Sequence, residues 1–171
     1  WLGHINGVIK ASFKNNSDKS LKAKGLYKNY LRVILPFDTE LKSVEINGNS
    51  QKITDAITDP TVYEKKNFVP PSALEVEKQN ENGKTTYGFL VLLQPGELKT
   101  IDISYNLSKK VNLKKADFTY DLKIFKQPGI DEYPYDLSIV LPSSLTAINV
   151  SKQAEFKDQV ITQAKQIVKD E

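Results

Sequence analysis

Short runs of alternating apolar and polar residues fill most of this chain and constrain its fold more than any other feature. In segment 92–105, a Pro95-Gly96 turn separates two such runs, and in the second Ile101, Ile103 and Tyr105 fall on one parity. Residues two apart line one face of a strand, because successive side chains point to opposite faces. Such runs recur about every 8–12 residues, which predicts an all-β fold, mainly an antiparallel β-sandwich, with an immunoglobulin-like arrangement as one form of it.

Turn residues separate the runs and define the expected strands. The segments expected to form strands are 5–13, 27–35, 41–46, 73–78, 85–93, 99–107, 118–125, 135–141 and 145–150. Asn47-Gly48 is the strongest hairpin signal, because a type I′ turn requires positive φ at both central positions. Segment 51–54 is a candidate short partner of 41–46, and segment 79–84 is expected to be a longer hairpin loop.

The last twenty residues allow two interpretations. Their apolar residues recur at the spacing of an amphipathic helix: Phe156, Val160, Ile161, Ala164, Ile167 and Val168. The same residues also allow two short strands joined by a turn at Lys157-Asp158. Periodicity alone favours the helix.

The length and composition of the chain predict one domain cut from a longer protein. With 171 residues, 39% of them hydrophobic, we expect a single sandwich over 1–171. The chain has no cysteine, which excludes disulfides and thiolate metal sites. It has no methionine and starts at Trp1, so we expect an N-terminal part outside it. No apolar run approaches the roughly 20 residues of a membrane helix, so we expect membrane attachment only through that missing part.

The charged residues argue against a nucleic-acid partner. The chain has 24 basic and 21 acidic residues, mixed along its length, and Arg32 is the only arginine. Proteins that bind nucleic acids use arginine for bidentate contacts to bases and phosphates. No cluster of basic and aromatic residues compensates for its scarcity here, so we expect no nucleic-acid binding.

No complete catalytic motif is present in the sequence. His4 is the only histidine, so a site with two histidine ligands is excluded. A Ser-His-Asp triad would have to use His4, but no GxSxG elbow accompanies it, and the chain has no HExxH, Walker or GxGxxG motif. We therefore expect no catalytic residue, no metal and no cofactor.

The candidate binding residues lie together in the second half of the chain. Asp131 and Glu132 fall in an expected loop and could bind a cation or a sugar. Tyr133 and Tyr135 follow at once, and they either form an aromatic platform or pack in the core with the hydroxyl at the rim. Surface carboxylates are more often simply solvated, and both alternatives stay open at this point.

Five other residues are expected to have structural roles. Arg32 lies on the face of its strand opposite to the apolar residues, where its guanidinium can hold carbonyl or carboxylate oxygens at the rim of a sandwich. Pro95-Gly96 and Pro128-Gly129 have the composition of tight turns.

Three segments, in this order, resemble a bacterial membrane-anchored family known as domain of unknown function 4012. Segment 27–36 (YKNYLRVILP) resembles its "Y-x-N-Y-L-R-V-y-v-P", and the Pro95-Gly96 turn leading to Ile103-Ser104-Tyr105 resembles its "v-x-P-G-x-x-x-t-v-x-l-x-Y". Segment 120–129 (YDLKIFKQPG) is similar to its "Y-x-L-x-i-q-K-Q-P-G", with Phe125 where the family commonly has Gln. The resemblance implies the extracytoplasmic C-terminal part of an envelope protein, and strands over 156–168.

The sequence and the resemblance together lead to one functional expectation and its alternatives. We expect a non-catalytic structural or binding module of a bacterial cell-surface protein, located outside the cytoplasm. Its partner would be a cell-envelope polysaccharide or another surface protein. The alternatives are a carbohydrate-binding module for cell-wall or capsular polysaccharide, and an enzyme that uses clustered carboxylates.

Overall fold

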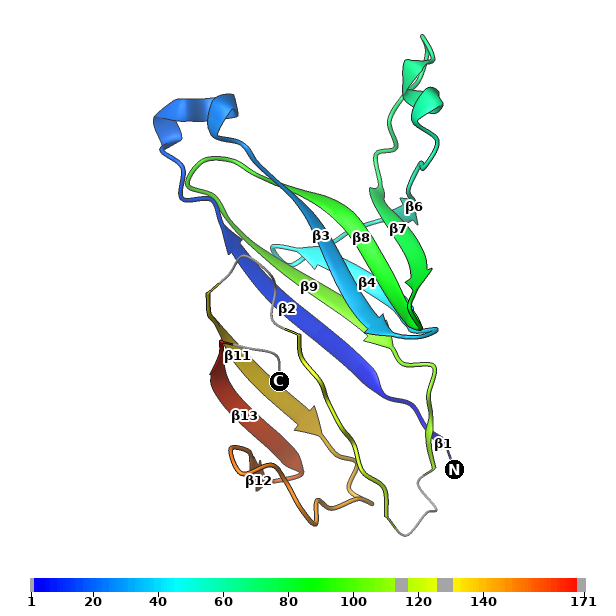
Figure 1. Cartoon of the computed structure of the whole chain (residues 1–171), viewed down its shortest axis with the longest axis vertical. Coiled ribbons are helices and arrows are strands. Elements are labelled where there is room, and N and C mark those ends of the chain that lie inside the picture. The colour runs from blue at the N-terminus through cyan, green and yellow to red at the C-terminus, as the bar shows by residue number, and fades with distance from the viewer. Residues whose placement is uncertain (1, 113–116, 126–130, 169–171) are drawn as a thin grey trace. The chain divides into compact units, whose positions relative to one another are not determined.

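The computed structural model of the chain describes residues 2–112, 117–125 and 131–168. Their contacts form two compact units, Trp1–Asn112 and Leu113–Glu171, each with its own sheets (Figure 1). The single domain expected over 1–171 stays a prediction.

The described residues confirm the predicted all-β, mainly antiparallel fold. Among them, every strand pairing except that of β6 with β7 is antiparallel. The helical elements that they contain are two short 3-10 segments, η1 (Lys19–Gly25) and η2 (Pro60–Glu64). The immunoglobulin-like arrangement stays a prediction.

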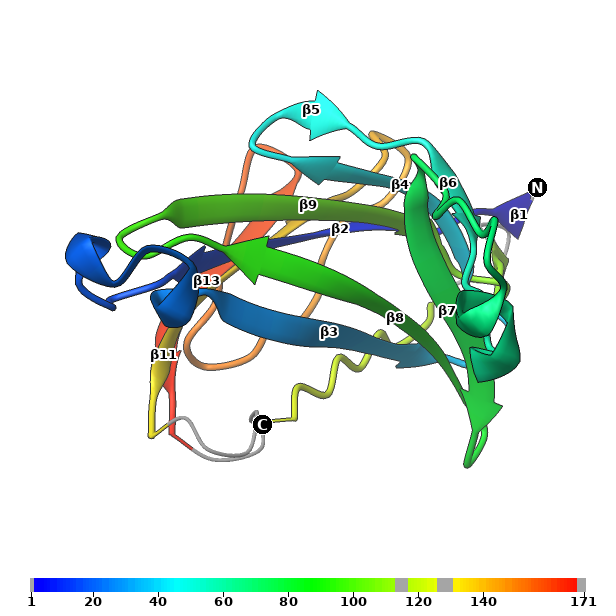
Figure 2. The same ribbon diagram turned by 90° about the horizontal axis from the view of Figure 1, so that it is seen from above.

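The first unit is built from two four-stranded sheets. One has the order β2 (Asn6–Lys14), β9 (Leu98–Asn106), β4 (Glu40–Ile46), β5 (Asn49–Ser50). The other has the order β3 (Tyr27–Pro36), β8 (Lys84–Leu93), β7 (Leu74–Glu81), β6 (Ile53–Asp55). Figure 2 shows β9 and β4 on one side and β8 and β3 on the other. A short pair, β1 (Leu2–Gly3) with β10 (Val111–Asn112), completes the unit.

The hydrophobic core of the first unit contains residues from both sheets. Its buried members are Val33, Leu35, Val44, Val76, Tyr87, Phe89, Val91, Leu93, Ile101 and Ile103. Within β3 and β9 these residues lie two apart, as the alternation predicts. The strands of the two sheets other than β5 form because each places apolar side chains in or against this core, where they leave water.

The second unit contains the sheet β11 (Tyr133–Val140), β13 (Val160–Ile167), β12 (Glu155–Lys157). The strands implied for 156–168 by the resemblance are confirmed, and the helix favoured by periodicity is wrong. Asp158 and Gln159, with φ of 50° and 66°, form the two-residue connection between β12 and β13. The turn therefore lies one residue later than expected. The apolar residues have a helical spacing, but that spacing is a local preference, and the pairing of β13 with β11 outweighs it.

Two other predicted strands are wrong. Segment 118–125 and segment 145–150 contain no strand in the structure, although the apolar residues of the first alternate. The backbone N–H and C=O groups of a strand need hydrogen-bond partners on a neighbouring strand. The residue pattern of one segment does not reveal whether such a neighbour exists.

Two-residue turns close the hairpins of the first unit. Asn47 and Gly48 have φ of 51° and 76° and connect β4 to β5, which confirms the predicted hairpin. Asn82 and Gly83, with φ of 49° and 69°, connect β7 to β8. The hairpin predicted around segment 79–84 is therefore confirmed, but its loop has two residues and not six, because β7 continues to Glu81 and β8 begins at Lys84. Segment 51–54 lies outside β5, and its last two residues begin β6. The strand that pairs with β4 is therefore Asn49–Ser50 and not that segment.

The Pro95-Gly96 turn joins the two sheets of the first unit and does not close a hairpin. It connects β8 to β9, which lie in different sheets. The Glu97 N–H donates a 3.0 Å hydrogen bond to the Gln94 carbonyl, and Gly96 has a φ of 73°, as a type II turn requires at its third residue. Pro128 and Gly129 lie outside the described residues.

Candidate functional site

The richest arrangement of exposed side chains lies on the outward face of β3, β8 and β7. Alternation places one parity of each strand on this face, away from the core. We call it the outer β3–β8–β7 face; its residues are Lys28, Tyr30, Arg32, Ile34, Glu75, Glu77, Gln79, Glu81, Lys84, Thr86, Gly88, Leu90 and Leu92. Tyr30, Ile34 and Leu90 expose 49%, 61% and 49% of their surface.

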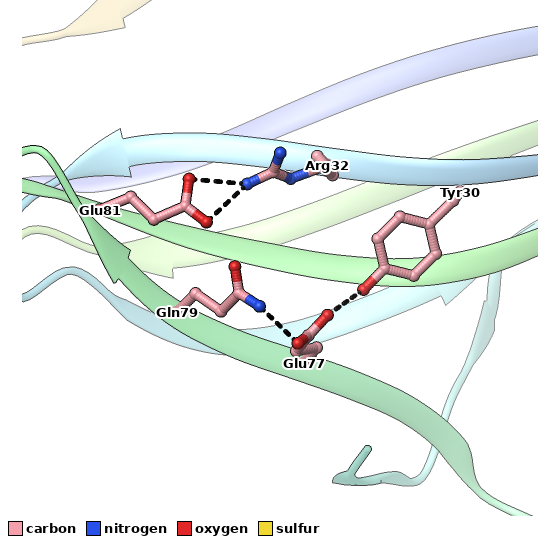
Figure 3. A network of polar contacts seen from close by, with 5 residues as sticks. All are labelled: Tyr30, Arg32, Glu77, Gln79 and Glu81. Carbon is pink, nitrogen blue, oxygen red and sulfur yellow. Dashed lines mark hydrogen bonds and ion pairs between the residues drawn. The ribbon is translucent and has the colours of Figure 1, made fainter. Parts of the chain in front are cut away.

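A polar network crosses this face from β3 to β7 (Figure 3). The Tyr30 hydroxyl donates a 2.5 Å hydrogen bond to Glu77 Oε2, and Gln79 Nε2 donates one of 2.5 Å to Glu77 Oε1. Arg32 Nη2 donates to both carboxylate oxygens of Glu81, at 3.0 and 2.9 Å. Tyr30 and Arg32 on β3 thus reach across β8 to carboxylates on β7.

Gly88 is what allows Tyr30 to cross β8. A Cβ atom at position 88 would lie 2.5 Å from Tyr30 Oη and 2.8 Å from its Cζ, so the hydroxyl end of the ring occupies that space. Tyr30 is paired with Leu90, and Gly88 with Arg32 and Glu77, so the ring leans by two positions along β8 toward Glu77. Covering a strand glycine with a cross-strand aromatic ring is a known stabilising device in sheets.

The environment of the Tyr30 hydroxyl keeps it protonated. Burial of the hydroxyl, together with the hydrogen bond to Glu77 and its negative charge, raises the pKa of Tyr30 to about 12. The raised pKa keeps the hydroxyl a hydrogen-bond donor to pH values above 10. The hydrogen bond to Glu77 and the close approach to Gly88 hold the ring in one orientation.

Arg32 lies on this face and not in the core. Its side chain is 45% exposed and that of Glu81 is 47% exposed. Exposed ion pairs of this kind stabilise a fold by only about 0–1 kcal/mol. Arg32 thus contacts a carboxylate on β7, and its structural role stays a prediction.

The candidate binding residues of the sequence lie at the start of β11 in the second unit. Asp131 and Glu132 are exposed and precede the strand, whereas Tyr133 and Tyr135 are half-buried within it. Both tyrosines share a face of β11 with half-buried Leu137, and Tyr133 is paired with the fully buried Ile167. The two rings therefore lie on the packed face of the sheet and are neither fully exposed nor buried.

A cavity of about 470 Å³ lies in the second unit. Its lining combines apolar Leu137 and Ala164 with six polar residues, which are Asp136, Ser138, Gln153, Glu155, Thr162 and Gln163. Alternation along β11 places Asp136 and Ser138 opposite to the face that carries Tyr133 and Tyr135. Tyr133 and Tyr135 do not line this cavity, so the cavity and the candidate tyrosines do not form one site.

A second cavity, of about 400 Å³, contains the only histidine of the chain. His4 shares its lining with Asp38, Ser108, Lys78 and Lys110, among others. Ser108 Oγ donates a 3.1 Å hydrogen bond to the Phe37 carbonyl, and within the described part of the chain no hydrogen bond joins His4 to Asp38 or Ser108. The hydrogen bonds that would activate a serine nucleophile are thus not formed between these residues.

Residues 2–112, 117–125 and 131–168 hold no group of three or more His, Cys, Asp or Glu side chains placed to bind a metal ion. Across the same residues, no helix has the length and apolar character to span a membrane.

No protein-family model, curated protein or solved structure matches this chain. The resemblance to domain of unknown function 4012 therefore stays a prediction.

The sequence did not single out Tyr30 as a site residue. Its parity, shared with Arg32 and Ile34, did show that it lies on the face opposite to the apolar side of β3. The residues that complete the network, Glu77 and Glu81, lie on one parity of β7. Their position beside Tyr30 depends on β8 lying between the two strands, which only the structure reveals.

Proposed function

We propose that this chain is a non-catalytic binding module of a bacterial cell-surface protein. The outer β3–β8–β7 face supports the binding role, because it presents exposed aromatic and aliphatic side chains beside a fixed polar network. Contiguous exposed apolar side chains with polar neighbours are typical of binding surfaces. The cell-surface location rests on the three segments that resemble the envelope family.

The sheet itself supports recognition by this face. The backbones of β3, β8 and β7 are hydrogen-bonded to one another, so their outward side chains stand on a rigid support. Because these side chains are already held in place, a ligand that binds them orders few further groups, and little conformational entropy is lost on binding.

A carbohydrate-binding module for cell-wall or capsular polysaccharide is the second candidate. It is favoured by a specific combination on this face, a half-exposed tyrosine ring beside carboxylate, amide and guanidinium groups. Sugars have apolar C–H faces and rims of hydroxyl groups, and such a combination is complementary to both. Asp131, Glu132, Tyr133 and Tyr135 form the alternative location for this activity.

An array of purified bacterial cell-wall and capsular polysaccharides, probed with the labelled full chain, tests both proposals. Specific retention on a polysaccharide without release of reducing ends supports the binding module and its carbohydrate form. Binding to no array member rejects the carbohydrate form. Release of reducing ends that persists in His4→Ala but disappears in Asp131→Asn or Glu132→Gln would overturn the non-catalytic proposal.

A further inference from the structure

The geometry points to a subsite for a neutral saccharide on the outer β3–β8–β7 face, with the Tyr30 ring as its platform. This inference rests on the proposed binding function and gives it a location and a ligand class. Arg32, Glu77, Gln79 and Glu81 would supply the hydrogen bonds around the ring.

The Tyr30 ring is preorganised for contact with an apolar surface. Its hydroxyl end lies over Gly88 and donates to Glu77, which removes rotational freedom before any ligand arrives. About half of the side chain still faces solvent, with a relative exposure of 49%. The electron-rich face of such a ring attracts the weakly positive C–H groups on one side of a sugar, and their contact also buries apolar surface.

The polar groups around the ring retain unused hydrogen-bonding capacity. Of the five N–H donors of Arg32, those on Nε and Nη1 make no hydrogen bond to any described residue. The carbonyl oxygen of the Gln79 side chain likewise accepts none from that part of the chain. Free donors on β3 and a free acceptor on β7 thus lie on either side of β8. Both kinds of group suit sugar hydroxyls, because each hydroxyl donates and accepts.

The charges of the face select an uncharged ligand. Its cationic residues are Lys28, Arg32 and Lys84, and its acidic residues are Glu75, Glu77 and Glu81. The two signs balance, and Arg32 is already paired with Glu81. A polyanion such as nucleic acid or a uronic-acid polymer would meet three carboxylates with no excess positive charge to compensate, so a neutral polysaccharide fits better.

Affinity electrophoresis of the full chain in native gels provides the test. The gels contain soluble neutral polysaccharides (mannan, galactan, β-glucan or dextran), and polygalacturonate serves as the acidic probe. We expect at least one neutral polymer to retard the wild-type chain and polygalacturonate not to do so. Dissociation constants from gels at several polymer concentrations are then compared among variants.

Two substitutions of Tyr30 separate the ring from its hydroxyl. Tyr30→Leu keeps an apolar cover over Gly88 but removes the aromatic face, and we expect it to weaken binding by about five-fold or more. Tyr30→Phe keeps the ring and should stay within about three-fold of the wild type. Tyr27→Ala is the matched control, because Tyr27 lies on the same strand with 47% exposure but on the other parity, and its binding should be unchanged.

Several results would overturn the inference. These are no retardation by any neutral polymer, retardation by polygalacturonate alone, or a Tyr30→Leu variant that binds as the wild type does. Loss of binding in Tyr133→Ala or Tyr135→Ala but not in Tyr30→Leu would keep the carbohydrate-binding function and reject this location. Self-association abolished by Tyr30→Leu, without saccharide binding, would assign the face to a second copy of the chain.

Discussion

The ring of Tyr105 on β9 occupies the space that a side chain at position 7 of β2 would need. Gly7 and Tyr105 are paired directly across the two strands, and a Cβ atom on Gly7 would lie 2.5 Å from Tyr105 Oη and closer still to its Cζ. The same device recurs in the other sheet, where Tyr30 covers Gly88. Each sheet of the first unit therefore contains a glycine that makes room for a cross-strand tyrosine.

Gly7→Ala tests this relationship. The added methyl group must displace the Tyr105 ring, and overpacking of this kind lowers the free energy of unfolding by about 1–3 kcal/mol. Urea denaturation measures the change. Val8→Ala is the neighbouring control, because Val8 is exposed, and it should change stability by no more than about 0.5 kcal/mol. An equal effect of both substitutions would contradict the steric explanation.

Asn15→Ala should be among the most destabilising polar substitutions. Asn15 is 5% exposed, and its side-chain amide donates to the carbonyls of Gly25 and Leu93, at 2.7 and 3.0 Å. Its backbone also stabilises the Pro95-Gly96 turn, because the Gly96 N–H donates a 2.8 Å hydrogen bond to the Asn15 carbonyl. Removal of the amide leaves the carbonyls of Gly25 and Leu93 without this donor. Each carbonyl that stays buried then lowers the free energy of unfolding by about 1–3 kcal/mol.

Thermal and urea unfolding of Asn15→Ala measure that cost. Asn16→Ala is a close control, because Asn16 is exposed and should behave as the wild type does. Wild-type stability in Asn15→Ala would show that water replaces the lost hydrogen bonds.

Gly96→Ala tests the turn that connects the sheets. With φ at 73°, position 96 lies in the left-handed region, where a residue with a Cβ atom costs about 1–2 kcal/mol more than glycine. Pro95→Ala should cost less, about 0.4–1 kcal/mol, because it acts mainly by loosening the unfolded chain. Chemical denaturation of both variants shows which one loses more free energy of unfolding. A larger loss in Pro95→Ala than in Gly96→Ala would contradict this account.

Arg32→Ala should have a small effect on stability. The ion pair with Glu81 is exposed on both sides, so we expect the free energy of unfolding to fall by less than about 1 kcal/mol. The double variant with Glu81→Ala, measured with both single variants, isolates the pair itself. A coupling energy well above that bound would show that Arg32 has the structural role expected from the sequence.

The stability of the protein should depend on pH through Tyr30. Its pKa is raised from 10.0 to about 12, so the folded state prefers the protonated hydroxyl. The stabilisation is complete below pH 10 and is lost as the pH rises from 10 toward 12. In urea denaturation across this range, the wild type should lose more stability than Tyr30→Phe, which cannot ionise there. A constant difference between the two proteins from pH 9 to 12 would refute the shift.

The strands that the sequence predicted well are those in which alternation coincides with a buried partner. Segment 27–35 became β3 because Val33 and Leu35 reach the core, and segment 99–107 became β9 because Ile101 and Ile103 do. Segment 118–125 alternates as clearly but forms no strand. Alternation is a property of one segment, whereas a sheet needs a second segment to pair with it. The alternation of the first segment does not show which segment that is, or whether one exists.

The candidate site shows the same division. The parity of Tyr30 and Arg32 is visible in the sequence and correctly places both on the outer side of β3. Their partners Glu77 and Glu81 are 47 and 49 residues further along the chain. Only the strand order β3-β8-β7, with a glycine at position 88 between them, brings these groups together.

The sequence by itself determined the all-β class, most strand positions and the Asn47-Gly48 hairpin, because these follow from side-chain alternation and from the φ angles that Asn and Gly tolerate. The tertiary structure decided which strands share a sheet. The Pro95-Gly96 turn illustrates the difference, because its composition predicts a reversal of the chain but not that the next strand enters the opposite sheet. That choice depends on burying both apolar faces in one core, and a local turn carries no information about that core.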